Sequence, residues 1–98
     1  MMDRQQLWNG CHVRRNLGRV SIYNHRGDRI IWGDEVILLW DGYYKVRNGS
    51  FWRVYDPLGE LIANIWGDIV ELLDEGLFRC YRAGIYHYYD IYGRERRF

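Results

Sequence analysis

Apolar and polar residues alternate along much of this chain with a period of two, which is typical of β-strands with one buried face. Residues 43–47 and 51–55 alternate in this way on either side of Asn48-Gly49, a pair that strongly favours a hairpin turn. The second of these segments ends at residues 56–59, Asp-Pro-Leu-Gly, whose composition is typical of a β-turn. The pattern therefore predicts short strands joined by tight turns.

The same pattern occurs three times along the sequence. Residues 7–28 (LWNGCHVRRNLGRVSIYNHRGD) align with residues 39–60 (LWDGYYKVRNGSFWRVYDPLGE) at an offset of 32 positions. At an offset of 34 positions the second copy meets a third, and Tyr55-Asp56 then matches Tyr89-Asp90. A fixed period of this size predicts one supersecondary unit stacked on copies of itself. We expect one domain, residues 1–98, with copies at about residues 7–38, 39–72 and, in part, 73–98.

These segments predict an all-β fold. We expect an antiparallel meander of about nine or ten short strands, built from roughly three repeats of 32–34 residues and curled into a twisted sheet or an open barrel. No eleven-residue window keeps a helical period of 3.6 without meeting a glycine or a turn cluster, so helices are not expected.

The alternation also indicates which side chains form the core. The columns that are apolar or aromatic in successive copies are Val20/Ile22, Trp52/Val54 and Tyr86/Tyr88; Tyr44/Val46 and Phe78/Cys80; and Val36/Leu38 and Val70/Leu72. In the first copy, His12 and Arg14 stand where the later copies have the Tyr44/Val46 and Phe78/Cys80 pairs. A more polar face is typical of a terminal unit, so residues 7–18 are predicted to cap the stack.

The opposite side of one strand in each copy supplies the candidate binding residues. Tyr23, Tyr55 and Tyr89 form a constant aromatic column, and the neighbouring column is polar and variable, with Ser21, Arg53 and His87. This arrangement predicts a partner-binding strip formed by Tyr23, Arg53, Tyr55, His87 and Tyr89. The alternative is that these tyrosines belong to a second packed face, with their hydroxyl groups at its edge.

Composition supports a binding surface more than it supports catalysis. The chain has five Trp, nine Tyr and three Phe, and thirteen of its fourteen basic residues are Arg. Arginine stacks on aromatic rings and binds carboxylate or phosphate groups in a bidentate manner, so such side chains suit an interface. Charge is unevenly divided: six basic and two acidic residues in 1–29, three and nine in 30–76, and five and two in 77–98.

The residues that could carry chemistry do not form a recognisable site. Cys11 and Cys80 are predicted to be free thiols, and the three histidines lack a second ligand at metal spacing. The acidic pairs Asp34-Glu35 and Asp74-Glu75 are adjacent in sequence, and neighbours in a strand point to opposite faces. We expect no enzyme activity, no cofactor and no metal.

The repeated unit resembles that of the WG-repeat family of bacterial β-repeat proteins. The order of that unit is followed by DGYYKV at residues 41–46, Asn48-Gly49, WRVYD at residues 52–56, Gly59 and Leu61-Ile62. Residues 75–93 repeat it. Ser21, Arg53 and His87 stand where the family has a glycine after the aromatic residue. The resemblance covers about residues 7–98 and implies a repeat scaffold for protein interaction, with no catalytic residues to carry over.

The functional prediction is a small non-catalytic protein-interaction module of the cytoplasm, which acts by occluding a surface of its partner protein. The cytoplasmic assignment depends on a start, MMDRQQLWNG, that lacks the apolar segment of a signal peptide. Single-stranded nucleic-acid binding through an Arg/aromatic β surface is the alternative, although the acidic centre opposes it. Membrane binding is not expected. A homodimer is predicted at the C-terminal edge strand, residues 86–91, because exposed aromatic edges tend to pair.

Overall fold

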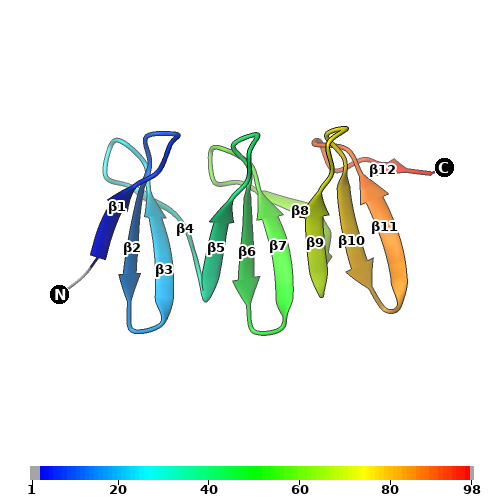
Figure 1. Ribbon diagram of the computed structural model, residues 1–98, viewed down its shortest axis with the longest axis horizontal. Helices are drawn as coiled ribbons and strands as arrows, with labels where there is room; N and C mark the ends of the chain where they lie inside the picture. Colours follow the sequence, from blue (N-terminus) through cyan, green and yellow to red (C-terminus); the bar gives the residue numbers. More distant parts are fainter. Residues whose placement is uncertain (1–2, 98) are drawn as a thin grey trace.

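The computed structural model describes residues 3–97 and confirms the all-β antiparallel prediction (Figure 1). No helix occurs in that part of the chain. Its strands are β1 (Asp3–Gln6), β2 (His12–Asn16), β3 (Arg19–Tyr23), β4 (Arg29–Gly33), β5 (Glu35–Leu38), β6 (Tyr44–Asn48), β7 (Phe51–Tyr55), β8 (Leu61–Gly67), β9 (Ile69–Leu72), β10 (Phe78–Arg82), β11 (Ile85–Tyr89) and β12 (Glu95–Arg96).

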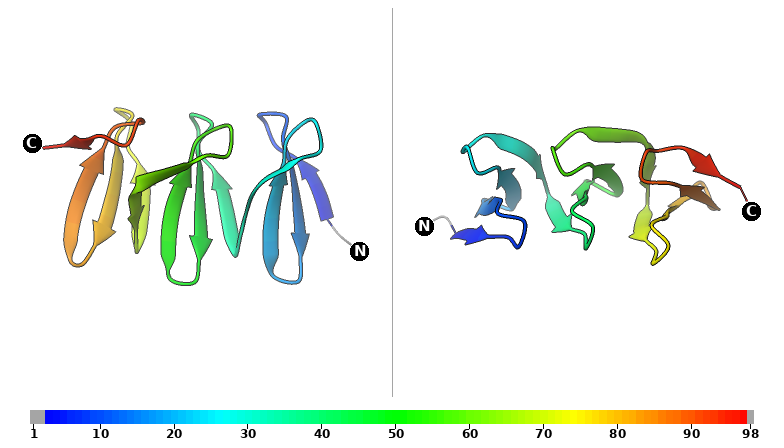
Figure 2. Two further views of the ribbon diagram at one scale, coloured as in Figure 1. Left: turned by 180° about the vertical axis from the view of Figure 1, so that it is seen from behind. Right: turned by 90° about the horizontal axis from the view of Figure 1, so that it is seen from above.

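The strands form three four-stranded sheets, in the orders β1-β2-β3-β4, β5-β6-β7-β8 and β12-β11-β10-β9. The sheets follow one another along the longest axis of the molecule, whose extents are 47 × 24 × 19 Å (Figure 1). Seen from above, the chain runs from one sheet to the next through β4 and β8, and β1 and β12 lie at opposite ends (Figure 2). The described strands thus number twelve, in place of the nine or ten that we expected, and the sheets do not close into a barrel.

The sheets stack because the middle one is apolar on both faces. Residues paired across antiparallel strands point to the same face, so Val46 lies on one face with Arg53, and Val54 lies on the other with Lys45. Val46 belongs to a buried cluster shared with the first sheet, and Val54 to a cluster shared with the third. We call the face toward the preceding sheet the leading face, and the face toward the following sheet the trailing face.

The hairpin turns set the register of each sheet. In the first and third sheets the two turn residues are Leu17-Gly18 and Ala83-Gly84, and all four have positive φ angles, as a type I′ turn requires. In the second sheet Asn48 pairs with Phe51, so the turn residues are Gly49 and Ser50, with positive φ at Gly49. The hairpin predicted from Asn48-Gly49 is therefore present, with its turn one residue further along.

The turns that follow β3, β7 and β11 share one side-chain cap. The Oδ1 atom of Asp56 accepts hydrogen bonds from the backbone N–H groups of Leu58 and Glu60, each at 2.9 Å. Asn24 and Asp90 accept the equivalent bonds in the first and third sheets. In each turn the side-chain oxygen accepts hydrogen bonds from backbone N–H groups that have no carbonyl partner within the turn. This requirement explains why an Asn or Asp recurs there.

The repeated Trp-Gly-Asp segments connect one sheet closely to the next. At Gly33, an added Cβ would overlap the side chain of Val46, and at Gly67 it would overlap the carbonyl oxygen of Tyr81. The backbone N–H of Asp34 donates to the carbonyl of Arg47 at 2.8 Å, and that of Asp68 donates to Tyr81 at 2.8 Å. Glycine is needed because backbone passes directly against the central hairpin of the following sheet.

Most of the predicted core is buried as expected. Val20, Ile22, Tyr44, Val46, Val54, Val70, Phe78 and Cys80 lie in the two clusters, and the half-buried Val36, Leu38, Trp52 and Leu72 pack against them. Burial of Tyr86 and Tyr88 was predicted wrongly: Tyr86 is 51% exposed and Tyr88 is half-buried. They lie on the trailing face of the third sheet, where no fourth sheet follows among the described residues.

Candidate functional site

The five residues predicted to bind a partner all lie on leading faces. Tyr23 is paired with His12 on the first sheet, Tyr55 with Tyr44 on the second, and Tyr89 with Phe78 on the third. Stacking covers two of these faces, so Tyr55 is half-buried against the first cluster and Tyr89 is only 6% exposed. The three tyrosines therefore do not form one continuous strip, and Tyr55 and Tyr89 belong to packed faces.

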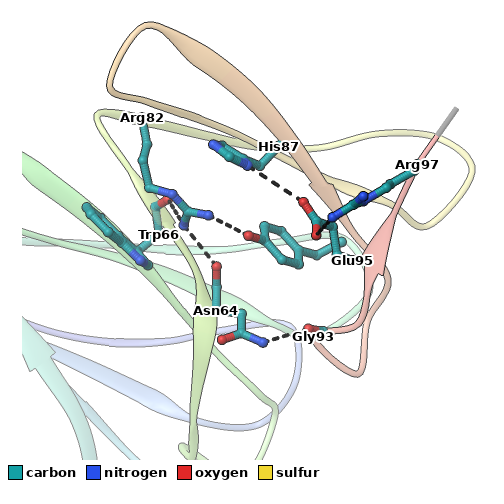
Figure 3. Close-up of polar contacts among 8 residues, drawn as sticks. Asn64, Trp66, Arg82, His87, Gly93, Glu95 and Arg97 are labelled. Carbon is teal, nitrogen blue, oxygen red and sulfur yellow. Dashed lines mark hydrogen bonds and ion pairs between the residues drawn. The ribbon is translucent and has the colours of Figure 1, made fainter.

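The hydroxyl of Tyr89 is held at the boundary between the second and third sheets. The Arg82 guanidinium donates a hydrogen bond to it and also donates to the carbonyl oxygens of Asn64 and Trp66 on β8, at 3.1 and 3.2 Å (Figure 3). The same guanidinium lies over the Trp66 ring, 4.8 Å from its centroid. Arg82, on β10, therefore connects β8 with β11 through hydrogen bonds, and we assign it a structural role.

The two polar residues of the predicted strip are separated. Arg53 is exposed on the second sheet and lines a shallow hollow with Phe51, Ala63 and Trp66. His87 is half-buried on the third sheet, where its ring stacks on Tyr89 and its Nδ1 lies 3.8 Å from Glu95 (Figure 3). Arg53 is thus accessible from solvent, whereas His87 already has partners in its own sheet.

An aromatic surface that the sequence strip does not include is the trailing face of the third sheet, which we call the C-terminal end face. It is formed by cross-strand neighbours on β9, β10 and β11, namely Ile69, Glu71, Arg79, Tyr81, Tyr86 and Tyr88. The rings of Tyr81 and Tyr86 are 4.9 Å apart, and Ile69 is 48% exposed beside them. Three tyrosines and an isoleucine here have no covering sheet in the described chain.

Two equivalent cationic residues show how the C-terminal end face corresponds to the trailing face of the second sheet, which the third sheet covers. Lys45 on the second sheet lies 4.9 Å from the Trp52 ring, and Arg79, 34 residues later, lies 5.2 Å from the Tyr86 ring. Glu71 accepts a hydrogen bond from Arg79 at 3.0 Å, and this bond raises the pKa of the guanidinium. The Arg79–Tyr86 contact on the C-terminal end face is therefore the equivalent of the Lys45–Trp52 contact at the boundary between the second and third sheets.

The leading face of the first sheet, at the other end, is basic. We call it the N-terminal end face; cross-strand pairing places on it Arg14, Arg19, Ser21, Tyr23, Arg29 and Trp32. A hollow of about 450 Å³ on this face is lined by the three arginines and by Tyr23, among others. Arg14 lies over the Tyr23 ring at 5.5 Å, and Arg29 lies over the Trp32 ring at 4.5 Å. His12 and Arg14 also lie on this face, against which no other sheet packs among residues 3–97.

The buried ionisable groups are structural. Cys11 and Cys80 are free thiols, as predicted, and burial raises the pKa of Cys80 to about 11. Burial also raises the pKa of Tyr44, whose hydroxyl accepts a hydrogen bond from Asn9 at 2.6 Å. Across residues 3–97, no group of three His, Cys, Asp or Glu side chains could hold a metal ion. None of the described segments is a helix of the length and apolar character that would cross a membrane.

Two comparisons with known proteins leave this picture unchanged. The chain matches no model of a known protein family, and no curated protein matches its sequence significantly. The resemblance to WG-repeat proteins therefore stays a prediction from the motif alone.

The sequence pattern indicates a polar first face but does not identify either end face as a binding surface. The alternation places Tyr86 and Tyr88 in the core because Trp52 and Val54 occupy the same columns one copy earlier. One signal that bears on the C-terminal end face is that the trailing column of the third copy has no later copy in residues 3–97 to pack against. Aromatic residues kept at such positions indicate a binding surface more directly than a constant column inside the stack.

Proposed function

We propose that this protein is a small, non-catalytic protein-interaction module whose partner binds the C-terminal end face. The observation that carries the proposal is the exposure of Tyr86, at 51%, in the column where Trp52 packs against the following sheet. Exposed tyrosine and arginine side chains on a rigid sheet are the groups that contribute most to binding at protein interfaces. Binding there occludes the corresponding surface of the partner.

The covered faces indicate what kind of surface fits. At the boundary between the second and third sheets, Trp52 and Val54 meet the side chains of Phe78 and Cys80 from a second β-sheet. Lys45 donates a hydrogen bond to the carbonyl of Val70 in that sheet, at 2.9 Å. The expected partner therefore presents a β-sheet face or an extended strand with apolar side chains and accessible carbonyl groups.

The test is capture of proteins from an extract of the native cell by the immobilised chain, followed by binding measurements with the purified partner. Tyr86→Glu should abolish capture, because it removes the ring and places a charged carboxylate in a surface that the partner would bury. Trp40→Glu is the matched control, because Trp40 is an aromatic residue that is 60% exposed on a turn outside the end face. Circular dichroism establishes that both variants are folded.

In the direct measurement, Tyr86→Ala should weaken the partner complex by about tenfold or more, as expected for a central interface tyrosine. Arg53→Ala tests the site predicted from the sequence, and the proposal expects it to leave affinity unchanged. Capture that depends on Arg53 or Trp40 and not on Tyr86, or that disappears after nuclease treatment, contradicts this assignment.

A further inference from the structure

We propose that the N-terminal end face is a second binding site, which takes a short single-stranded nucleic acid. This site lies at the opposite end of the molecule from the proposed protein-binding surface and does not depend on it (Figure 1). The proposal rests on the positions of Arg14, Arg19 and Arg29 around one hollow, and on the two aromatic rings, Tyr23 and Trp32, beside them.

The arginines and rings are arranged as platforms. The guanidinium of Arg29 lies 4.5 Å from the centroid of Trp32, and that of Arg14 lies 5.5 Å from the centroid of Tyr23. A guanidinium plane supported by a ring offers a flat surface on which a base can stack, with N–H groups at its edge for a phosphate. Trp32 is 50% exposed, so part of its own ring is also open to a base.

The charge on this face suits a polyanion of limited length. Arg19 lies 3.8 Å from the carboxylate of Asp34, and Asp34 also accepts a hydrogen bond from the backbone N–H of Gly49. The other eight acidic residues of segment 30–76 lie from β5 onward, and their charge repels a strand that continues past the first sheet. The ligand therefore contacts about three phosphates, one for each arginine.

Nucleic acid fits this surface better than an acidic peptide does. Three arginines alone would serve either ligand, but the side chains of an acidic peptide carry no aromatic ring that can stack on Trp32 and Tyr23. Stacking on aromatic side chains is the contribution that single-stranded nucleic acids make and carboxylates do not. We expect the site to bind without preference for base sequence, because every base has a flat face that can stack.

The test is fluorescence anisotropy with a labelled oligothymidylate and a labelled oligouridylate of about eight nucleotides, enough to exceed the site. With about three phosphates contacted, the logarithm of affinity should fall against the logarithm of salt with a slope of about −2. Arg29→Ala should weaken binding and make that slope shallower by about 0.7.

Trp32→Leu separates stacking from charge, because it keeps apolar bulk and removes only the aromatic plane. It should weaken binding roughly fivefold or more with the salt slope unchanged. Arg94→Ala is the matched control, since Arg94 lies over another exposed ring, Tyr92, in the turn before β12. It should bind as the parent chain does.

Three outcomes would overturn the proposal. The first is the absence of measurable binding to either oligonucleotide at low salt. The second is equal binding by the parent and the Trp32→Leu variant, which would reduce the site to a non-specific positive patch. The third is a polyglutamate peptide that binds as tightly as the oligonucleotides, which would assign the face to acidic proteins. A Tyr86→Glu variant should bind the oligonucleotides normally, so failure here is distinct from failure of the protein-binding proposal.

Discussion

The ammonium group of Lys45 on β6 donates a hydrogen bond to the carbonyl oxygen of Val70 on β9, across the boundary between the second and third sheets, at 2.9 Å. The same side chain covers the ring of Trp52. One residue thus contributes both to the packing of its own sheet and to the contact with the next. At the corresponding place in the third sheet, Arg79 covers the ring of Tyr86, and no following sheet is present in the described chain.

Trp52 and Tyr86 should therefore differ in their contribution to stability. We expect Trp52→Ala to lower the free energy of unfolding by about 2 kcal/mol or more, because it leaves a space against the third sheet. Tyr86→Ala should cost within about 1 kcal/mol, as at other exposed sites. Urea unfolding followed by circular dichroism measures both, and similar losses for the two variants would contradict the assignment of the C-terminal end face.

Gly67→Ala should destabilise the junction between the second and third sheets. An added methyl group would lie 3.1 Å from the carbonyl carbon of Tyr81 and closer still to its oxygen, and neither strand can move without breaking backbone hydrogen bonds. We expect a loss of about 3 kcal/mol in the free energy of unfolding, at the upper end of overpacking effects.

The control for Gly67→Ala is the neighbouring exposed residue, Asp68. Replacing Asp68 by Ala should change stability by no more than about 0.5 kcal/mol. An alanine at position 67 that leaves the unfolding midpoint unchanged would show that the two sheets are not in close contact there.

The two cysteines should react at different rates in the folded protein. Cys80 is fully buried, and burial raises the pKa of its thiol to about 11, so little thiolate is present at pH 8. Cys11 is partly exposed. Iodoacetamide at that pH should modify Cys11 first, as mass spectrometry of the peptides will show, and modify both only after denaturation. Rapid native labelling of Cys80 would mean that the second cluster opens readily.

The homodimer predicted from the sequence can be tested at the third sheet. β12 pairs with Tyr88 and Tyr89 of β11, and no strand within residues 3–97 pairs with the outer edge of β11 near Ile85, which is 60% exposed. Exposed edges with apolar side chains tend to pair with another chain. We expect light scattering to give twice the 12.0 kDa chain mass, and Ile85→Lys to restore the monomer. A parent chain that stays at the monomer mass across the micromolar range removes this prediction.

The local features of the fold could be predicted from the sequence because they depend on neighbouring residues. The two-residue period, the Asn48-Gly49 hairpin and the turn at Asp56 each follow from backbone preferences over a few positions. The offsets of 32 and 34 residues also indicated that the unit would be stacked on copies of itself. They likewise indicated a polar first face, at His12 and Arg14.

The relative placement of the sheets could not be predicted in the same way. Alternation shows that Val46 and Val54 point to opposite faces, but not whether a face is covered by another sheet, by solvent or by a partner. The tertiary structure places Tyr89 inside the stack and Tyr86 outside it, although both are aromatic residues of the same strand. The reason is physical: burial of a side chain depends on which distant segment lies against it, and that contact is decided by how the sheets stack in three dimensions.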